Sequence, residues 1–148
     1  GFENVSATEI QAIMNVNLTS PIHLVQKLLK NVREGKLKKI IFLGSTCGLE
    51  NEGGDAVVYA ASKFGVRGLT HALREYVRKD GIAVSCISPG SIASDVPFSA
   101  GMETALQKHN GRRMPVADVV AVINLVIHSS FAACVKEVHI PALSDTDV

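Results

Sequence analysis

The order of segments along the chain is the feature that most limits its possible folds. Long segments with apolar residues at helical spacing alternate with short apolar segments rich in β-branched residues. The order is helix, strand, helix, strand, helix, strand. Such alternation predicts parallel strands joined by right-handed helical crossovers. We therefore expect an α/β fold in which helices flank a parallel sheet of about three strands.

The first helix carries a start signal and an internal break. Ser6–Glu9 forms a capping box, in which the hydroxyl and the carboxylate satisfy free N–H groups. The periodicity that follows predicts a helix over about 7–33, with Gly35 as its C′ residue. Pro21 lies inside this segment and lacks an N–H donor, so we expect the helix to loosen near Asn17.

The other elements follow from apolar runs and from Gly and Pro at their ends. The run at 38–43 predicts a strand buried on both faces, and the run at 82–88 predicts a second buried strand. The remaining expected elements are a loop at 44–55, a helix at 56–79 ending at Gly81, a loop from Pro89 to Gly101, a short helix at 102–109, a helix that Pro115 opens at its first turn, a strand at 135–140 and a tail at 145–148.

Length and composition exclude several classes of protein. The 148 residues suit one domain, 1–148, and 47% hydrophobic with 20% charged residues excludes disorder for most of the chain. Lys and Arg number 15 and Asp and Glu 14, a balance that argues against nucleic-acid and anionic-membrane proteins. The apolar runs are far shorter than the roughly 20 residues of a spanning helix. No secretory signal pattern opens the sequence.

Cysteine usage indicates a reducing compartment, and we expect a cytoplasmic protein. Cys47, Cys86 and Cys134 are odd in number, widely spaced and form no CxxC pair. The five histidines have no metal-ligand spacing with cysteine or carboxylate, so we expect no metal site.

Tyr59 and Lys63 form the strongest candidate for catalytic chemistry. They stand in Y-A-A-S-K at the start of the expected second helix, and a spacing of four residues puts both on one face. An ammonium group and a helix N-terminus both stabilise a phenolate. Such a phenol can exchange a proton with a carbonyl or an alcohol oxygen. Taken alone, the pair is also compatible with two exposed residues on a helix.

Three neighbouring segments make the catalytic interpretation more specific. Ser45 follows a strand in G-S-T-C-G, Asn17 stands at the expected break of the first helix, and Pro89-Gly90 follows the second strand. Each also has a purely structural interpretation, as a turn residue, a helix-break residue and a turn. Their joint occurrence in this order favours a shared site.

With these motifs the chain resembles the short-chain dehydrogenase/reductase family, classical type, from about Ser6 to Ile140. The family includes 3-oxoacyl-acyl-carrier-protein reductases and related ketone or alcohol oxidoreductases. The resemblance implies part of a Rossmann-like, doubly wound parallel sheet. It also implies reversible hydride transfer between NAD or NADP and a small-molecule carbonyl or alcohol.

The resemblance assigns a role to each matched residue. It implies that Tyr59 is the general acid/base, and that Lys63 supports it and holds the cofactor ribose. Ser45 would orient the substrate oxygen, and Asn17 would hold a water in a proton relay. Beside the nicotinamide it places Pro89, Gly90, Ile92 and Ser94.

Spacing inside the site departs slightly from the family. Tyr59 comes fourteen positions after Ser45, which is about one more than the resemblance implies. The G-S-x-x-G frame favours Ser45 and a one-residue insertion within 49–58. Thr46 fits the spacing but not the frame and is the second choice.

The larger departure is a missing half. The twelve glycines include no cluster of the kind that binds a pyrophosphate at a helix N-terminus. About a hundred residues that would form the first half of a doubly wound sheet are absent. The residue that selects NAD or NADP lies in that half, so the sequence leaves the preference open.

Three interpretations account for catalytic residues without a phosphate site. In the first, which we favour, the chain is part of a longer enzyme. In the second, it is a non-catalytic remnant or an oligomerisation module with a fossil active site. In the third, it folds together with a second polypeptide that supplies the missing half. The four retained residues Asn17, Ser45, Tyr59 and Lys63 count against the remnant.

The missing half predicts an open sheet edge. The strand at 38–43 becomes an edge with unpaired backbone groups, which association, swapping or a rearranged first helix would cover. The resemblance also implies a homodimer or homotetramer built on the two long helices, with Ala60, Phe64 and Leu73 as interface residues or, alternatively, as residues that pack on the sheet.

The loop at 91–101 and the helix after it are expected to cover the substrate pocket. Its apolar residues suggest the lining, although they also suit ordinary packing. They are Val96, Pro97, Phe98 and Met102.

Overall fold

Three parallel strands form the single sheet of the computed structural model, which describes residues 1–50 and 54–145. The strands are β1 (Lys39–Leu43), β2 (Ala83–Pro89) and β3 (Glu137–Ile140), in the order β1-β2-β3. The predicted α/β fold with a parallel sheet is therefore confirmed, and β1 lies at one edge.

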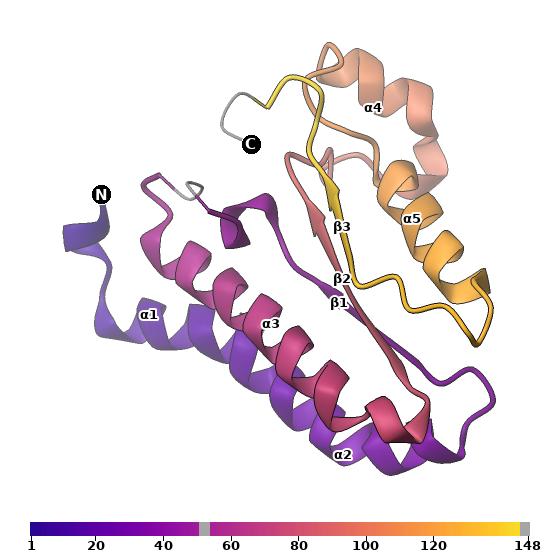
Figure 1. The fold of residues 1–148 in the computed structure, drawn as a ribbon. Coiled ribbons are helices and arrows are strands. Elements are labelled where there is room, and N and C mark those ends of the chain that lie inside the picture. The colour runs from indigo at the N-terminus through magenta and orange to yellow at the C-terminus, as the bar shows by residue number, and fades with distance from the viewer. Residues whose placement is uncertain (51–53, 146–148) are drawn as a thin grey trace.

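Helices cover both faces of this sheet (Figure 1). On one face lie α1, α2 and α3, and on the other lies α5, with α4 beyond the carboxyl ends of the strands. The helices are α1 (Ala7–Met14), α2 (Ser20–Glu34), α3 (Val57–Tyr76), α4 (Met102–Lys108) and α5 (Val116–His128).

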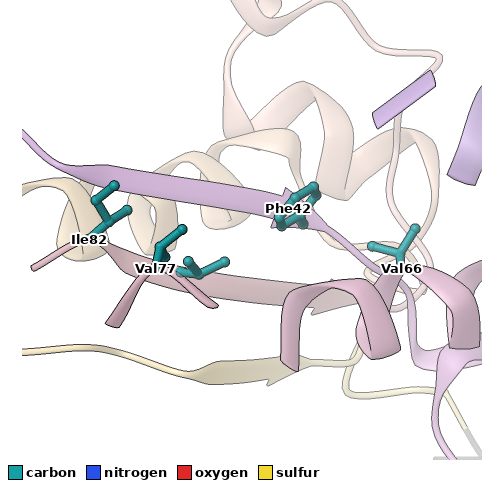
Figure 2. Packing of buried hydrophobic residues seen from close by; sticks show 5 residues of the cluster. Phe42, Val66, Val77 and Ile82 are labelled. Atoms are coloured by element: carbon teal, nitrogen blue, oxygen red, sulfur yellow. The ribbon is translucent and has the colours of Figure 1, made fainter. Parts of the chain in front are cut away.

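The main core lies between the sheet and α3. Figure 2 shows Phe42, Val66, Val77 and Ile82 meeting there, and Val84 of the central strand completes the cluster. Strand β2 is buried from its second residue to its last because it has a strand on each side and helices on both faces. The buried run expected at 82–88 is confirmed.

The first helix contains the predicted break. The capping box is present, with Ser6 Oγ accepting from the Glu9 N–H at 3.2 Å and the Glu9 carboxylate accepting from the Ser6 N–H at 2.9 Å. Between α1 and α2, Asn15–Thr19 forms a π-helical turn. This turn directly precedes Pro21, whose ring lacks the N–H that an α-helical bond back to residue 17 requires.

The expectation that the first strand is buried on both faces is wrong. Only Phe42 of β1 is buried, and Leu43 is 52% exposed. The strand has a neighbour on one side only, so its other side stays open. The prediction of an edge strand at this position is confirmed.

Several predicted boundaries also need correction. Gly35 has extended backbone, with φ −74°, and is not a left-handed C′ residue. The helix expected at 56–79 ends at Tyr76, and a 3-10 turn leads to Gly81 at φ 68°. Pro115 is the N-cap of α5 and not part of its first turn. The last strand begins at Glu137, and most of the expected tail, 146–148, lies outside the described residues.

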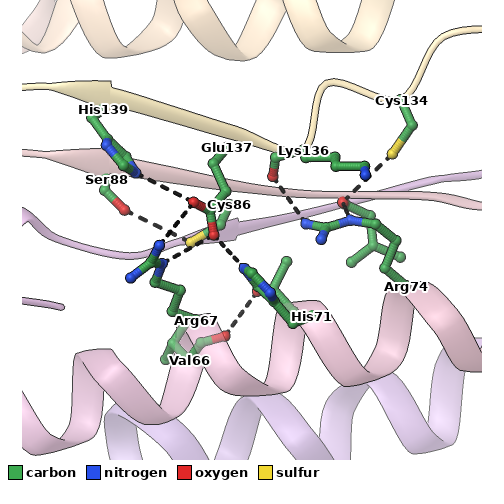
Figure 3. A network of polar contacts seen from close by, with 12 residues as sticks. Val66, Arg67, His71, Arg74, Cys86, Ser88, Cys134, Lys136, Glu137 and His139 are labelled. Carbon is green, nitrogen blue, oxygen red and sulfur yellow. Dashed lines mark hydrogen bonds and ion pairs between the residues drawn. The ribbon is translucent and has the colours of Figure 1, made fainter. Parts of the chain in front are cut away.

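A polar network ties α3 to β3 (Figure 3). Arg67 Nε donates to the Glu137 carboxylate at 3.0 Å, and His71 Nε2 contacts the same group. Arg74 is buried and donates to the carbonyls of Val84 and Lys136 at 2.9 and 3.0 Å. The hydrogen bonds from Arg67 and then His71 lower the pKa of Glu137 to about 2, although burial opposes them.

This network predicts a loss of stability in acid. The folded-state pKa of Glu137 lies below its unfolded value, so its contribution is complete above about pH 5 and is lost as the pH falls through about 2. Glu137→Gln should therefore reduce stability at pH 7 by on the order of 2 kcal/mol and flatten its fall between pH 5 and 2.

Urea unfolding at stepped pH measures both effects. Glu34→Gln is the matched control, because it removes only an exposed pair with Lys30 within α2. An unchanged pH slope in Glu137→Gln would contradict the assignment.

Candidate active site

The candidate residues gather at the carboxyl ends of the strands. Ser45 follows β1, and Pro89 is the last residue of β2. Helix α3 returns antiparallel to the strands, so its first turn, with Tyr59, lies at the same end of the sheet (Figure 1). In open α/β sheets this edge is where ligands bind.

Tyr59 and Lys63 lie side by side, as their spacing predicts. Lys63 Nζ is 5.5 Å from the centroid of the Tyr59 ring. The same ammonium donates to the carbonyl oxygen of Leu43, at the end of β1, at 3.1 Å. Burial lowers the pKa of Lys63, and the thiols of Cys86 and Cys47 partly oppose this. Lys63 is thus held between the phenol and the sheet.

Asn17 is linked to the Tyr59 backbone through Ser62. Asn17 Nδ2 donates to Ser62 Oγ at 3.0 Å, and Ser62 Oγ donates to the backbone carbonyl of Tyr59 at 2.6 Å. The two helices approach closely because Gly65 has no side chain: a Cβ there would lie 2.6 Å from a methyl carbon of Leu18. The π-helical turn therefore carries Asn17 to the first turn of α3.

Ser45 is buried and caps a short turn. Its Oγ accepts from the Cys47 N–H at 3.2 Å at the start of the 3-10 turn Thr46–Gly48. The turn lies tightly on α3, since a Cβ at Gly48 would be 2.9 Å from the carbonyl carbon of Lys63. Within the described residues no hydrogen bond joins Ser45 to Tyr59 or Lys63.

The alternative residue Thr46 is also buried, in the same turn. The insertion expected within 49–58 includes 51–53, which lie outside the described residues. The choice between Ser45 and Thr46 therefore stays a prediction.

The segment after β2 forms a second part of the edge. The Gly90 N–H donates to the Ile140 carbonyl at 3.0 Å, and Ile92 forms an isolated bridge with Met114. Ser94 is exposed. In the part of the chain that the structure describes, no hydrogen bond connects this segment to Tyr59 or Lys63. The segment after β2 and the Tyr59–Lys63 pair therefore lie at one edge of the sheet without a direct contact of this kind.

The expected substrate loop packs on α4. Val96 is buried against Ala93 and Ala105, which agrees with its packing interpretation. Asp95 accepts from Lys108 Nζ at 3.0 Å and contacts His109 Nε2 at 2.8 Å.

The hydrogen bonds from Lys108 and His109 lower the pKa of Asp95 to about 2. Between loop and helix lies a narrow hollow of about 20 Å³. Among its lining residues are Val96, Pro97, Phe98 and Met102.

Sequence reasoning missed three residues that position this edge. Ser62 and Gly48 carried a signal, because both lie inside the quoted motifs Y-A-A-S-K and G-S-T-C-G. Asp145 carried none: its carboxylate accepts from the N–H groups of Ser91 and Ala142, both at 3.0 Å, across a loop that periodicity does not reveal.

The three cysteines form no disulfide. In residues 1–50 and 54–145 no group of His, Cys, Asp and Glu side chains has the geometry to hold a metal ion. None of the described helices is both long and apolar enough to cross a bilayer.

Comparison with known proteins gives one family. The model of the short chain dehydrogenases matches residues 1–103. The 3-oxoacyl-[acyl-carrier-protein] reductase FabG of Buchnera aphidicola subsp. Acyrthosiphon pisum is 29% identical over 124 residues, which cover 79% of this chain and 50% of that protein. The chain thus spans half the length of this relative.

Solved structures give the same fold. A closed form of serine dehydrogenase complexed with NADP+ superimposes with a TM-score of 0.75 at 22% identity, over 93% of this chain and 57% of that one. A 4-hydroxyisoleucine dehydrogenase complexed with NADH and succinate gives a TM-score of 0.74 at 24% identity, over 95% and 60%. At these identities the likeness concerns the fold, which is Rossmann-like.

The contact of the Thr46–Gly48 turn with α3 yields a prediction. Gly48→Ala places a methyl group against the Lys63 backbone, so it should destabilise the protein by roughly 1–3 kcal/mol. Gly68→Ala is the matched control: it lies within α3, nothing lies within 4 Å of its added Cβ, and it should stabilise the helix by roughly 0.5–1 kcal/mol. Denaturant unfolding of both variants measures the difference, and equal stabilities would show that the turn is not tightly seated.

Proposed function

Because this chain belongs to the short-chain dehydrogenase family, we propose that residues 1–148 form the single-domain catalytic part of an NAD(P)-dependent oxidoreductase that interconverts a carbonyl and an alcohol. The observation that carries the proposal is the pairing of Tyr59 and Lys63 at the carboxyl end of the sheet, with Nζ 5.5 Å from the ring centroid. A phenol beside an ammonium group can donate a proton to a developing alkoxide and accept one from an alcohol.

Each neighbouring residue supports a distinct part of this chemistry. Lys63 places a positive charge beside the Tyr59 ring, and its position is fixed by the Leu43 carbonyl. Asn17 and Lys63 pass protons onward, while Ser62 positions Asn17 against the Tyr59 backbone. Ser62 acts only through these two hydrogen bonds and is therefore a positioning residue.

Ser45 is proposed to hold the substrate oxygen. In the structure its Oγ accepts from the Cys47 N–H, which leaves the hydroxyl hydrogen able to donate. A hydroxyl that donates toward a carbonyl oxygen stabilises the negative charge that develops there. The same contact suits a plain turn residue, so Ser45 is best tested by its effect on turnover.

The donor groups present fit one end of a dinucleotide. The phenol, the ammonium and the hydroxyl of Ser94 suit ribose and carboxamide oxygens. The described residues include no glycine-rich turn leading into a helix N-terminus for a pyrophosphate. A bound dinucleotide supplies or accepts the hydride. The residues proposed to hold its nicotinamide end are Tyr59, Lys63, Pro89, Gly90, Ile92 and Ser94.

Substrate class and assembly are part of the same proposal. The proposed substrate is a small-molecule carbonyl or alcohol. The proposed homodimer or homotetramer would use the outer face of α3, where Phe64 is 43% exposed. Ala60 is half-buried there, and the partly buried Leu73 packs against the main core, which supports its alternative interpretation as a packing residue. We also propose a cytoplasmic location.

Tyr59→Phe tests the chemistry. In the chain joined to an amino-terminal half that supplies the dinucleotide-binding strands, the substitution should lower kcat by at least roughly 100-fold, because it removes the exchangeable proton. Ketone reduction followed by NADH and NADPH absorbance measures this. Circular dichroism of the variant should be unchanged.

Tyr76→Phe is the matched control, because Tyr76 is exposed near the far end of α3 beside Arg33 and should leave kcat unchanged. Full turnover by Tyr59→Phe would remove Tyr59 from its role. A Tyr76→Phe variant as slow as Tyr59→Phe would show that the loss is not specific to the site.

Dinucleotide titration of residues 1–148 alone gives a separate prediction. Without a pyrophosphate site, NADH and NADPH should bind more weakly than the micromolar range. Isothermal calorimetry measures this directly. Micromolar binding would contradict the prediction and would mean that the nicotinamide end suffices.

A further inference from the structure

A carboxylate from the segment after β3 holds the bend that follows β2, Gly90–Ser91. Asp145 Oδ2 accepts from the Ser91 N–H and from the Ala142 N–H, both at 3.0 Å. The first of these hydrogen bonds joins residues 54 positions apart in the chain. One carboxylate oxygen therefore connects the segments that leave two neighbouring strands.

These two segments lie too close together for a side chain at Gly90. A Cβ there would collide with Asp145 Oδ2 and would lie 3.0 Å from Pro141 Cα and 3.2 Å from the Ala142 nitrogen. The φ angle of Gly90 is not positive, so its backbone conformation does not require a glycine. Close approach of the two segments is what requires it.

The charge of Asp145 suits this contact. Burial opposes its ionisation, but the hydrogen bonds from Ser91 and Ala142 outweigh that effect and lower the pKa of Asp145. The carboxyl group is therefore ionised at neutral pH. Hydrogen bonds to an ionised acceptor are stronger than those between neutral groups, so this contact can order the bend.

The bend is also held from its other side. The Met114 N–H donates to the Ser91 carbonyl at 2.9 Å, and the Ala93 N–H donates to the Met114 carbonyl at 2.9 Å. Ser91 is thus fixed by Met114 through its carbonyl and by Asp145 through its N–H. Ligands of parallel sheets bind where loops leave the carboxyl ends of the strands, and this bend lies at such a place.

We propose that Asp145 is a positioning residue for the dinucleotide, because it holds the Gly90–Ser91 bend in the conformation that receives the nicotinamide end. The inference rests on the proposed function, which places the segment after β2 beside the nicotinamide. Asp145 acts through the bend and not by its own contact with the dinucleotide. A bend that is ordered beforehand lowers the conformational cost of binding.

A purely local role is the alternative. The Asp145 N–H donates to the Ala142 carbonyl at 2.9 Å, so the carboxylate contact with Ala142 also closes a four-residue turn, 142–145. If Asp145 served only this turn, removal of its carboxylate would loosen the segment after β3 and leave the Ser91 amide unchanged.

Amide exchange followed by NMR tests the contact itself, in the chain joined to an amino-terminal half that supplies the dinucleotide-binding strands. In Asp145→Ala the Ser91 amide should exchange roughly tenfold faster, because its acceptor is gone. Asp145→Asn keeps an acceptor oxygen of similar reach and should restore most of the protection. An unchanged Ser91 amide in Asp145→Ala would assign Asp145 to its own turn and overturn the proposal.

Dinucleotide titration of the same joined chain tests the positioning role. Asp145→Ala should raise both Kd and KM for NADH or NADPH by roughly tenfold and leave KM for the ketone unchanged. A merely structural defect would lower the folded fraction, which reduces kcat and leaves Kd and KM as they are. Asp145→Asn should stay within roughly threefold of the wild type. Equal Kd values for the wild type and Asp145→Ala would overturn the proposal.

Ser144→Ala is the matched control. Ser144 precedes Asp145 in the same segment, but its Oγ donates to the Arg112 carbonyl at 2.9 Å, outside the bend after β2. This variant should leave Kd unchanged. A rise as large as that of Asp145→Ala would show that any loosening of the segment weakens binding, and it would overturn the proposal. A wild-type chain that binds dinucleotide but reduces no ketone would contradict the proposed function and not this inference.

Discussion

The burial of β2 between two parallel neighbours is the constraint on which the rest of the structure depends. Parallel pairing with β1 and β3 forces each connection to return across the sheet as a helix. All three strands then end at one edge, and α3 begins there. The loop that carries Ser45 and the end of β2 at Pro89 reach the same edge for this reason, so the candidate site follows from the topology before any side-chain contact is considered.

Close helix contacts refine that arrangement. Gly65 lets the π-helical turn approach α3, and Gly48 lets the turn after β1 rest on the Lys63 backbone. Ser62, fully buried, joins Asn17 to the Tyr59 backbone. Because these residues are small, the segments that carry Asn17, Ser45 and Tyr59 lie close together around Lys63.

Lys63 links the proposed chemistry to the open edge. Its ammonium lies beside the Tyr59 ring and also bonds the outward Leu43 carbonyl. The open side of β1 therefore ends next to the proposed catalytic pair.

The sequence by itself determined the element order, the parallel sheet, the capping box, the break near Asn17 and the shared face of Tyr59 and Lys63. All of these follow from local periodicity, from the missing N–H of Pro21 and from helical spacing. Only the tertiary structure decided that Asn17 meets Ser62, that Lys63 bonds Leu43, that Asp145 holds the Ser91 loop and that β1 is half open. These contacts join residues far apart in the chain, and they depend on how closely helices and strands approach, which local patterns do not specify.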